Sequence, residues 1–292
     1  MMQAELNSYW TKFRRTLEMI KFEHSIFALP FALLAALLAA RGWPSGWQIG
    51  WIVAAMVGAR SAAMTFNRIV DRDTDARNPR TRMRALPAGE LSLGFALAFF
   101  VLAVAIYELA AWELNRLSLE LSLPALAWLL FYSYTKRFTW LSHWVLGVAL
   151  GLAPAAAWIA IRGSLAWPIL WLSGAVAFWV AGFDILYASQ DFDFDRSQPG
   201  LYSLPKRLGL SRALGWARAC HGALLILLAV TAAQFHLGRL GWMGWAVVAG
   251  LLGWEHSLVR KNDFSRVNTA FFTVNGYIGL LLLVIWGAAI VK

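Results

Sequence analysis

Long apolar stretches recur along almost the whole 292-residue sequence and leave few structures open to it. About 20 helical residues cross the hydrocarbon core of a bilayer, and most of these stretches approach that length. With 60% hydrophobic and 14% charged residues, the chain does not resemble a soluble domain. The stretches lie near residues 22–41, 47–66, 91–112, 117–134, 143–161, 165–189, 213–235, 240–256 and 269–290. The sequence therefore predicts an all-α integral membrane protein with about nine transmembrane helices.

Lysine and arginine residues concentrate in alternate connections between these predicted spans. In the nine-span arrangement twenty lie on one side of the membrane and five on the other, and Arg60 lies within a span. The positive-inside rule assigns the richer side to the cytoplasm. We therefore expect a multi-pass protein of a bacterial-type inner (plasma) membrane with a cytoplasmic N-terminus. The net charge of +10 then follows from topology, and we expect no nucleic-acid partner.

A weak internal repeat relates two parts of the chain. Asp71 and Asp75 map onto Asp191 and Asp195 with a shift of 120 residues, and the similar phrases RALPAGELS and YSLPKRLGLS follow. The shift spans four predicted crossings, an even number that preserves orientation. Repeats of this kind build many membrane bundles, so we expect two matching loops to converge on one central cavity, open to the cytoplasmic side.

The repeat also predicts the domain organisation. We expect one transmembrane domain that occupies residues 1–292, made of two four-helix halves and one extra helix. The halves and the extra helix are expected at approximately 1–140, 141–260 and 265–292.

Seven of the eight aspartates lie in two segments, NRIVDRDTD and DILYASQDFDFD, at the ends of apolar stretches. On a helix, Asp71 and Asp75 are four residues apart and share one face, as do Asp191 and Asp195. Mg²⁺ binds proteins through one or two carboxylates together with phosphate oxygens of a substrate. The two segments therefore predict a Mg²⁺ site at the cytoplasmic surface with these four carboxylates as ligands.

Further polar residues continue the two predicted helical stripes. Arg60 lies two turns before Asn67 on the first stripe, and a charge within a span is costly unless it faces a cavity or a partner. Asp184 and Tyr187 share the second stripe with Asp191. We expect Arg60, Asp184, Tyr187 and Asp191 to be catalytic. A structural ion pair for Arg60 and a buried acid that joins two helices for Asp184 are the alternatives.

Arginines crowd the loop after the first cluster, where phosphate oxygens could accept their hydrogen bonds, and we select Arg72 among them. Cations and carboxylate-bound Mg²⁺ stabilise a departing diphosphate, and an apolar cavity protects the allylic carbocation that forms. Prenyl transfer meets these demands. A secondary transporter is the alternative of another class, but transporter sites usually lie near the bilayer midplane, whereas these acids lie at helix ends.

The motifs NRIVDRDTD and DFDFD, with NPRTRMRALPAG, YSYTKR and YASQDFDFD, resemble those of the UbiA-type intramembrane aromatic prenyltransferases across essentially the whole chain. The resemblance implies that Asn67 and the four aspartates hold Mg²⁺ and the diphosphate of a polyprenyl donor, assisted by Lys136 and Arg137. One position departs from the family pattern, because Arg68 stands where many members have aspartate.

Within that family, KFEHSIFALPFALLAA, FNRIVDRDTDARNPRT and DILYASQDFDFDR are most similar to the bacterial quinone-pathway branch. The resemblance implies Mg²⁺-dependent transfer of a polyprenyl group from an allylic polyprenyl diphosphate to a hydroxylated aromatic carboxylate. A 4-hydroxybenzoate-like acceptor is expected, with the 1,4-dihydroxy-6-naphthoate type of menaquinone biosynthesis as the alternative. Arg60 and Lys21 are the candidate contacts for the acceptor carboxylate. Membrane lipid is an expected partner, and no protein partner is assigned.

Overall fold

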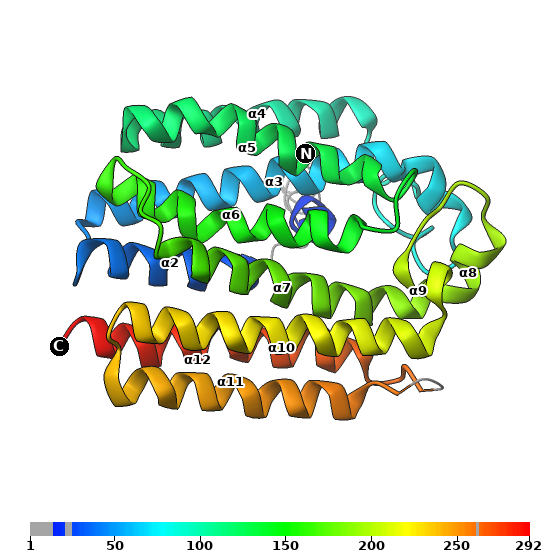
Figure 1. Cartoon of the computed structure of the whole chain (residues 1–292). Coiled ribbons are helices and arrows are strands. Elements are labelled where there is room, and N and C mark those ends of the chain that lie inside the picture. The colour runs from blue at the N-terminus through cyan, green and yellow to red at the C-terminus, as the bar shows by residue number, and fades with distance from the viewer. Residues whose placement is uncertain (1–13, 21–24, 261–262) are drawn as a thin grey trace.

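Helices make up the regular structure throughout the described residues, which are 14–20, 25–260 and 263–292 of this computed structural model (Figure 1). Residues 14–20 are helical, and an isolated bridge between Arg260 and Asp263 is the only paired extended backbone in the described part of the chain. The predicted all-α class is therefore confirmed. The labelled helices are α2 (Ser25–Ala40), α3 (Gly46–Arg77), α4 (Leu93–Leu114), α5 (Arg116–Thr135), α6 (Ser142–Arg162), α7 (Ile169–Ala188), the 3₁₀ turn η2 (Ser189–Asp191), α8 (Phe192–Ser197), α9 (Leu204–Leu208), α10 (Leu210–Gln234), α11 (Gly238–Leu258), the π-helical turn η3 (Thr269–Val274) and α12 (Asn275–Ile290).

Local sequence signals set several of the helix ends. The Ser45 hydroxyl accepts a hydrogen bond from the Gln48 N–H, and the Gln48 side chain accepts one from the Ser45 N–H, so a capping box starts α3. Asn115 is the one residue between α4 and α5, and its side chain accepts from the Ser118 N–H. Such short connections make consecutive helices antiparallel neighbours, and the long helices lie side by side in Figure 1.

Seven helices in the described ranges are long and apolar enough to cross a membrane. They are α3, α4, α5, α6, α7 with its continuation to Ser197, α10 and the helix at Thr269–Ile290. Of the nine predicted spans, two are left: α2, with a shorter apolar helix at Phe27–Ala40, and α11. Both belong to the same bundle, because α2 packs on α6 and α12, and α11 packs on α10 and α12.

Close contact between α6 and α7 depends on two glycines of α6. A Cβ atom on Gly147 would overlap the carbonyl oxygen of Ala177, and one on Gly151 would lie 2.7 Å from that of Ser173. Any side chain at these positions would push the helices apart, and small residues serve this purpose at membrane helix interfaces. The short distance between the two helices brings Asp184 of α7 beside His143 of α6.

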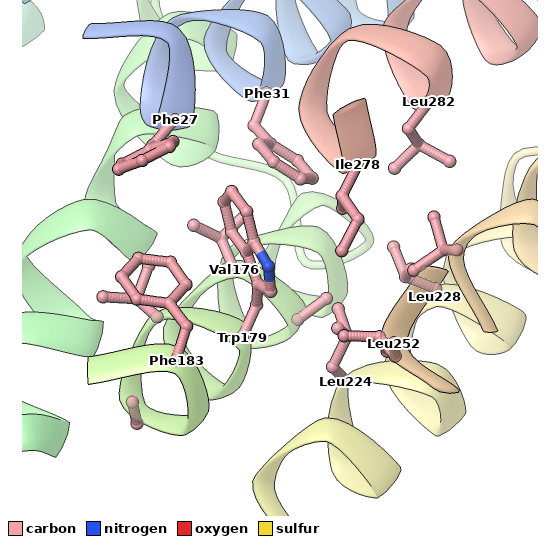
Figure 2. Close-up of a cluster of buried hydrophobic side chains, with 14 of the residues drawn as sticks. Phe27, Phe31, Val176, Trp179, Phe183, Leu224, Leu228, Leu252, Ile278 and Leu282 are labelled. Carbon is pink, nitrogen blue, oxygen red and sulfur yellow. The ribbon is translucent and has the colours of Figure 1, made fainter. Parts of the chain in front are cut away.

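Trp179 of α7 is fully buried at the centre of the bundle. Figure 2 shows its ring between Phe31 of α2 and Phe183, with centroid distances of 4.9 Å and 5.1 Å. Apolar residues of α10, α11 and α12, among them Leu224 and Ile278, complete the cluster. This core joins α7 to the last three long helices and fixes the helix from which the second aspartate cluster extends.

Polar groups cross the same core at Asn275. The Trp179 Nε1–H donates to Asn275 Oδ1 at 2.6 Å, and Asn275 Nδ2 donates to Glu255 Oε1 at 2.9 Å and to the Ala270 carbonyl oxygen at 3.1 Å. Asn275 and Glu255 are both fully buried. One amide therefore joins α7, α11 and the junction between η3 and α12.

Replacing Asn275 by leucine is expected to destabilise the fold. The indole N–H of Trp179 and the carboxyl group of Glu255 would lose their partner without access to water, and each buried unsatisfied group costs about 1–3 kcal/mol. Thermal unfolding in detergent should show a lower Tm for Asn275→Leu. Asn268→Leu is the matched control, because Asn268 lies on the same segment but is exposed. Equal Tm values for the two variants would contradict this prediction.

Candidate functional site

Asp71 lies near the end of α3 and is 1% exposed. Lys136 Nζ lies 2.5 Å from its Oδ2, Arg137 Nη2 lies 3.0 Å from its Oδ1, and Asn67 Nδ2 donates to Oδ2 at 3.1 Å. Because α3 continues without a break to Arg77, Asn67 and Asp71 share the predicted face. The two cations come from the turn directly after α5, which ends at Thr135.

Asp75, one turn further along α3, is 5% exposed. Nη1 of Arg84 lies 2.8 Å and 2.7 Å from its two carboxylate oxygens. Arg68, at the position that departs from the family pattern, is buried, with Nη1 4.0 Å from Asp75 Oδ2 and Nε donating to the Met19 carbonyl oxygen. A buried cation thus lies where the family pattern has an aspartate.

The second cluster does not lie on one uninterrupted α-helix. Asp184 and Tyr187 lie on α7, but this α-helix ends at Ala188, and Asp191 lies in the 3₁₀ turn that leads into α8. Tighter winding changes the direction of the side chains after Ala188. The chain therefore remains helical through Asp191 and Asp195, but a 3₁₀ turn interrupts the α-helix that the sequence predicted.

Arg80 connects the two clusters. Its Nε and Nη2 donate to Asp191 Oδ1 and Oδ2 at 2.8 Å and 2.6 Å, and its Nη1 donates to the Tyr187 hydroxyl at 3.3 Å. Burial lowers the pKa of Arg80, but the hydrogen bond and the charge of Asp191 outweigh it and raise this pKa above its usual value. Arg80 is therefore a permanent cation, and it joins loop 78–92 to the second cluster 111 residues later in the chain.

A second contact across the site involves the backbone. The Tyr202 N–H donates to the Lys136 carbonyl oxygen at 2.7 Å, so the segment before α9 lies beside the residues that follow α5. In Figure 1, α8 and α9 lie at the same end of the bundle as the end of α3. The two clusters therefore face one another at one end of the helices.

Asp195 and the remaining loop acids differ in their surroundings. The Ser203 hydroxyl donates to Asp195 Oδ2 at 2.8 Å. Arg72 pairs instead with the exposed Asp73, at 3.2 Å, and both side chains lie on the outer surface. Asp193 is exposed. The structure thus places Arg80 and Arg84 at the acidic cluster and Arg72 outside it.

Asp184 has a partner that the sequence did not indicate. Its Oδ2 lies 2.6 Å from Nδ1 of His143, and 19% of its side chain is exposed. His143 lies 41 residues away in the sequence on a different helix, and no spacing signal connects the two residues. Only the packing of α6 against α7 reveals this pair.

The two candidate contacts for an acceptor carboxylate are Arg60 and Lys21. Arg60 lies half-buried on α3, two turns before Asn67. Lys21 lies outside the described residues.

The donor set suits an ion that arrives with a phosphate ligand. In the described part of the chain, no three side chains of His, Cys, Asp or Glu are close enough to hold a metal ion by themselves. Mg²⁺ commonly takes only one or two carboxylates and completes its shell with water and substrate phosphates. Asp71 and Asp191 offer such oxygens, each held by cations that can also pair with phosphate.

These features define a helical membrane protein in which two clusters of aspartates, each paired with cations, face one another at one end of the bundle. The UbiA prenyltransferase family model matches residues 28–277. The chain therefore belongs to the UbiA prenyltransferase family, and it is a multi-pass membrane protein and a transferase.

Relatives and solved structures that match this chain belong to the same family. The 4-hydroxybenzoate octaprenyltransferase of Klebsiella pneumoniae subsp. pneumoniae is 33% identical over 227 residues, 76% of each chain. That of Vibrio cholerae serotype O1 is 32% identical over 78% of this chain and 81% of the relative. The apo structure of a UbiA homolog from Aeropyrum pernix K1 is 35% identical, with a TM-score of 0.79 over 92% of this chain and 97% of that one.

A fourth comparison shows the same fold at lower identity. The structure of a UbiA homolog from Archaeoglobus fulgidus bound to GPP and Mg²⁺ is 21% identical. Its TM-score is 0.71 over 95% of this chain and 99% of that one.

Proposed function

We propose that this chain transfers a polyprenyl group from an allylic polyprenyl diphosphate to 4-hydroxybenzoate in respiratory quinone biosynthesis. The observation that carries the proposal is the pair of facing aspartate clusters, each held by cations, at one end of an apolar bundle. Relatives named 4-hydroxybenzoate octaprenyltransferase support the choice of acceptor. The dihydroxynaphthoate acceptor of menaquinone biosynthesis is the alternative.

We assign the carboxylates of Asp71, Asp75, Asp191 and Asp195 to Mg²⁺ as its ligands. The UbiA homolog from Archaeoglobus fulgidus was solved with GPP and Mg²⁺ bound, which supports Mg²⁺ as the ion. When bound, the ion neutralises charge on the departing diphosphate. Binding requires Asp71, Asp75 and Asp191 to exchange their present cation partners, and the cations released can pair with phosphate oxygens instead.

The cations that bind the diphosphate are proposed from their positions. Lys136, Arg137 and the Asn67 amide all contact the Asp71 carboxylate. Arg80 and Arg84 join them, since both already contact site carboxylates. Arg72 contacts the diphosphate only if the donor extends to the outer surface of the protein, where Arg72 lies.

The reaction breaks the allylic carbon–oxygen bond of the donor, joins the resulting carbocation to a ring carbon of the acceptor, and releases one ring proton. Tyr187 and Asp191 lie at the diphosphate end of the site, linked through Arg80. Oδ2 of Asp184 is hydrogen-bonded to His143, and part of the Asp184 side chain is exposed. The other carboxylate oxygen, Oδ1, therefore takes up the ring proton. Arg60 and Lys21 bind the acceptor carboxylate.

The proposed topology has nine crossings, with α2 and α11 as the two additional spans. It consists of two four-helix halves, a ninth helix, a cytoplasmic N-terminus and a central cavity open to the cytoplasm. The concentration of basic residues around the two clusters supports this orientation through the positive-inside rule. A span as short as α2, with 16 residues, can cross where the bilayer thins locally.

Turnover by the purified protein tests the proposal. With a polyprenyl diphosphate, Mg²⁺ and 4-hydroxybenzoate in detergent or liposomes, we expect prenylated 4-hydroxybenzoate, and EDTA should abolish its formation. Product from dihydroxynaphthoate alone would assign the menaquinone reaction instead. Donor binding without product from either acceptor would contradict the proposed activity and favour another acceptor or a transporter.

A further inference from the structure

His143 occupies a buried position where α6, α7 and α9 meet, and 4% of its side chain is exposed. Its Nδ1 lies 2.6 Å from Asp184 Oδ2, and its Nε2 lies 3.3 Å from the backbone nitrogen of Leu204. A backbone N–H can only donate, so Nε2 of His143 must accept, and the proton of the neutral imidazole lies on Nδ1. Nδ1–H then donates to Asp184, which fixes both the ring orientation and the tautomer.

Nε2 of His143 accepts a hydrogen bond from the first turn of α9. Leu204 is the first residue of that helix, so its N–H has no hydrogen-bond partner within the helix. Leu204 is also fully buried. The preceding residue, Ser203, accepts from the Lys206 N–H at 3.4 Å and donates its hydroxyl to Asp195 Oδ2 at 2.8 Å. The start of α9 therefore connects His143 to a carboxylate of the site.

We propose that His143 is a positioning residue, which holds the start of α9 and through Ser203 keeps the Asp195 carboxylate in the orientation that binds the ion. This inference rests on the proposed function, in which Asp195 is a Mg²⁺ ligand. Residues that orient a metal ligand without touching the metal typically contribute about 10–100-fold to metal affinity. His143 needs no contact with the substrate to act in this way.

Two substitutions separate the two hydrogen bonds of His143. His143→Asn keeps an amide donor near the position of Nδ1 but offers no acceptor to Leu204, whereas His143→Gln places an amide oxygen near the position of Nε2. The measurement is calorimetric titration of Mg²⁺ in the presence of farnesyl S-thiolodiphosphate, an unreactive donor analogue. We expect about 10-fold weaker Mg²⁺ affinity or more in His143→Asn and less than about 3-fold in His143→Gln.

Asp184→Asn tests the tautomer. The asparagine amide would donate to Nδ1 and move the imidazole proton to Nε2, so that two donors face each other at Leu204. We expect this variant to weaken Mg²⁺ binding as His143→Asn does. In the His143→Gln background, the acceptor no longer depends on Asp184, and adding Asp184→Asn should leave Mg²⁺ affinity unchanged in a double-mutant cycle.

His221→Asn is the control for loss of a buried histidine. His221 lies on α10, is 3% exposed at its side chain and bonds the Trp179 carbonyl oxygen at 3.3 Å, without a link to α9. We expect lower thermal stability but unchanged Mg²⁺ affinity. Amide hydrogen exchange over residues 203–208, measured without metal, should be faster in His143→Asn and unchanged in His221→Asn.

The outcomes distinguish the positioning role from the proposed function. Equal Mg²⁺ affinity in the wild type, His143→Asn and Asp184→Asn would overturn the inference, as would unchanged exchange over 203–208. No binding of Mg²⁺ with the donor analogue to the wild type would contradict the proposed function instead. The exchange measurement would then still decide whether His143 holds α9.

Discussion

Replacing Asp191 or Asp71 by asparagine is expected to reduce kcat/KM by about 10³-fold or more while leaving the protein folded. Each substitution removes one negative charge and keeps the shape of the side chain. At Asp71, Lys136 and Arg137 would lose the carboxylate that holds them, and at Asp191 the same applies to Arg80. The site would then bind Mg²⁺ less tightly, and developing charge on the diphosphate would be stabilised less.

Two neighbouring aspartates provide matched controls. Asp73 and Asp193 lie two residues from Asp71 and Asp191, but both are exposed, and Asp73 pairs with Arg72. Asp73→Asn and Asp193→Asn should retain near wild-type kcat/KM, measured with a polyprenyl diphosphate and 4-hydroxybenzoate at saturating Mg²⁺. Retained activity in both Asp71→Asn and Asp191→Asn would exclude the assignment of the metal ligands.

The first cluster was predictable because helical periodicity alone determines it. Asn67, Asp71 and Asp75 are spaced by four residues on an apolar helix that continues to Arg77, so their common face follows from 3.6 residues per turn. The second cluster was predictable in composition but not in geometry. The segment YASQDFDFD has no sequence signal that distinguishes a continuous α-helix from one that tightens into a 3₁₀ turn at Ser189–Asp191.

Contacts made by loops and between helices could not be predicted. Arg80 and Arg84 reach the carboxylates because loop 78–92 folds back over the end of α3, whereas Arg72, which precedes that loop, is directed outward. The pair of His143 and Asp184 depends on how closely α6 approaches α7. That distance is a property of packing and is not encoded in the spacing of either helix.

Replacing Arg60 by alanine is expected to raise the KM for 4-hydroxybenzoate by about 10²-fold with a smaller change in the KM for the polyprenyl diphosphate. Loss of one partner of a buried, hydrogen-bonded charge pair costs about 2–5 kcal/mol in binding. Arg60 lies within α3, half-buried and two turns before Asn67, and we propose that it pairs there with the acceptor carboxylate. Arg60→Lys should give an intermediate KM, because an ammonium group keeps the charge but loses the planar fork that matches a carboxylate.

An acceptor without a carboxylate separates this role from a structural one. The wild type should discriminate strongly between 4-hydroxybenzoate and 4-hydroxybenzamide, and Arg60→Ala should lose most of that discrimination, because the charge that distinguishes the two acceptors is gone. A structural ion pair at Arg60 would instead lower Tm and reduce turnover of both acceptors equally. Arg116→Ala is the control for removing an arginine, since the Arg116 side chain is 91% exposed at the start of α5. An unchanged KM for 4-hydroxybenzoate in Arg60→Ala would exclude Arg60 from the acceptor site and leave Lys21 as the remaining candidate.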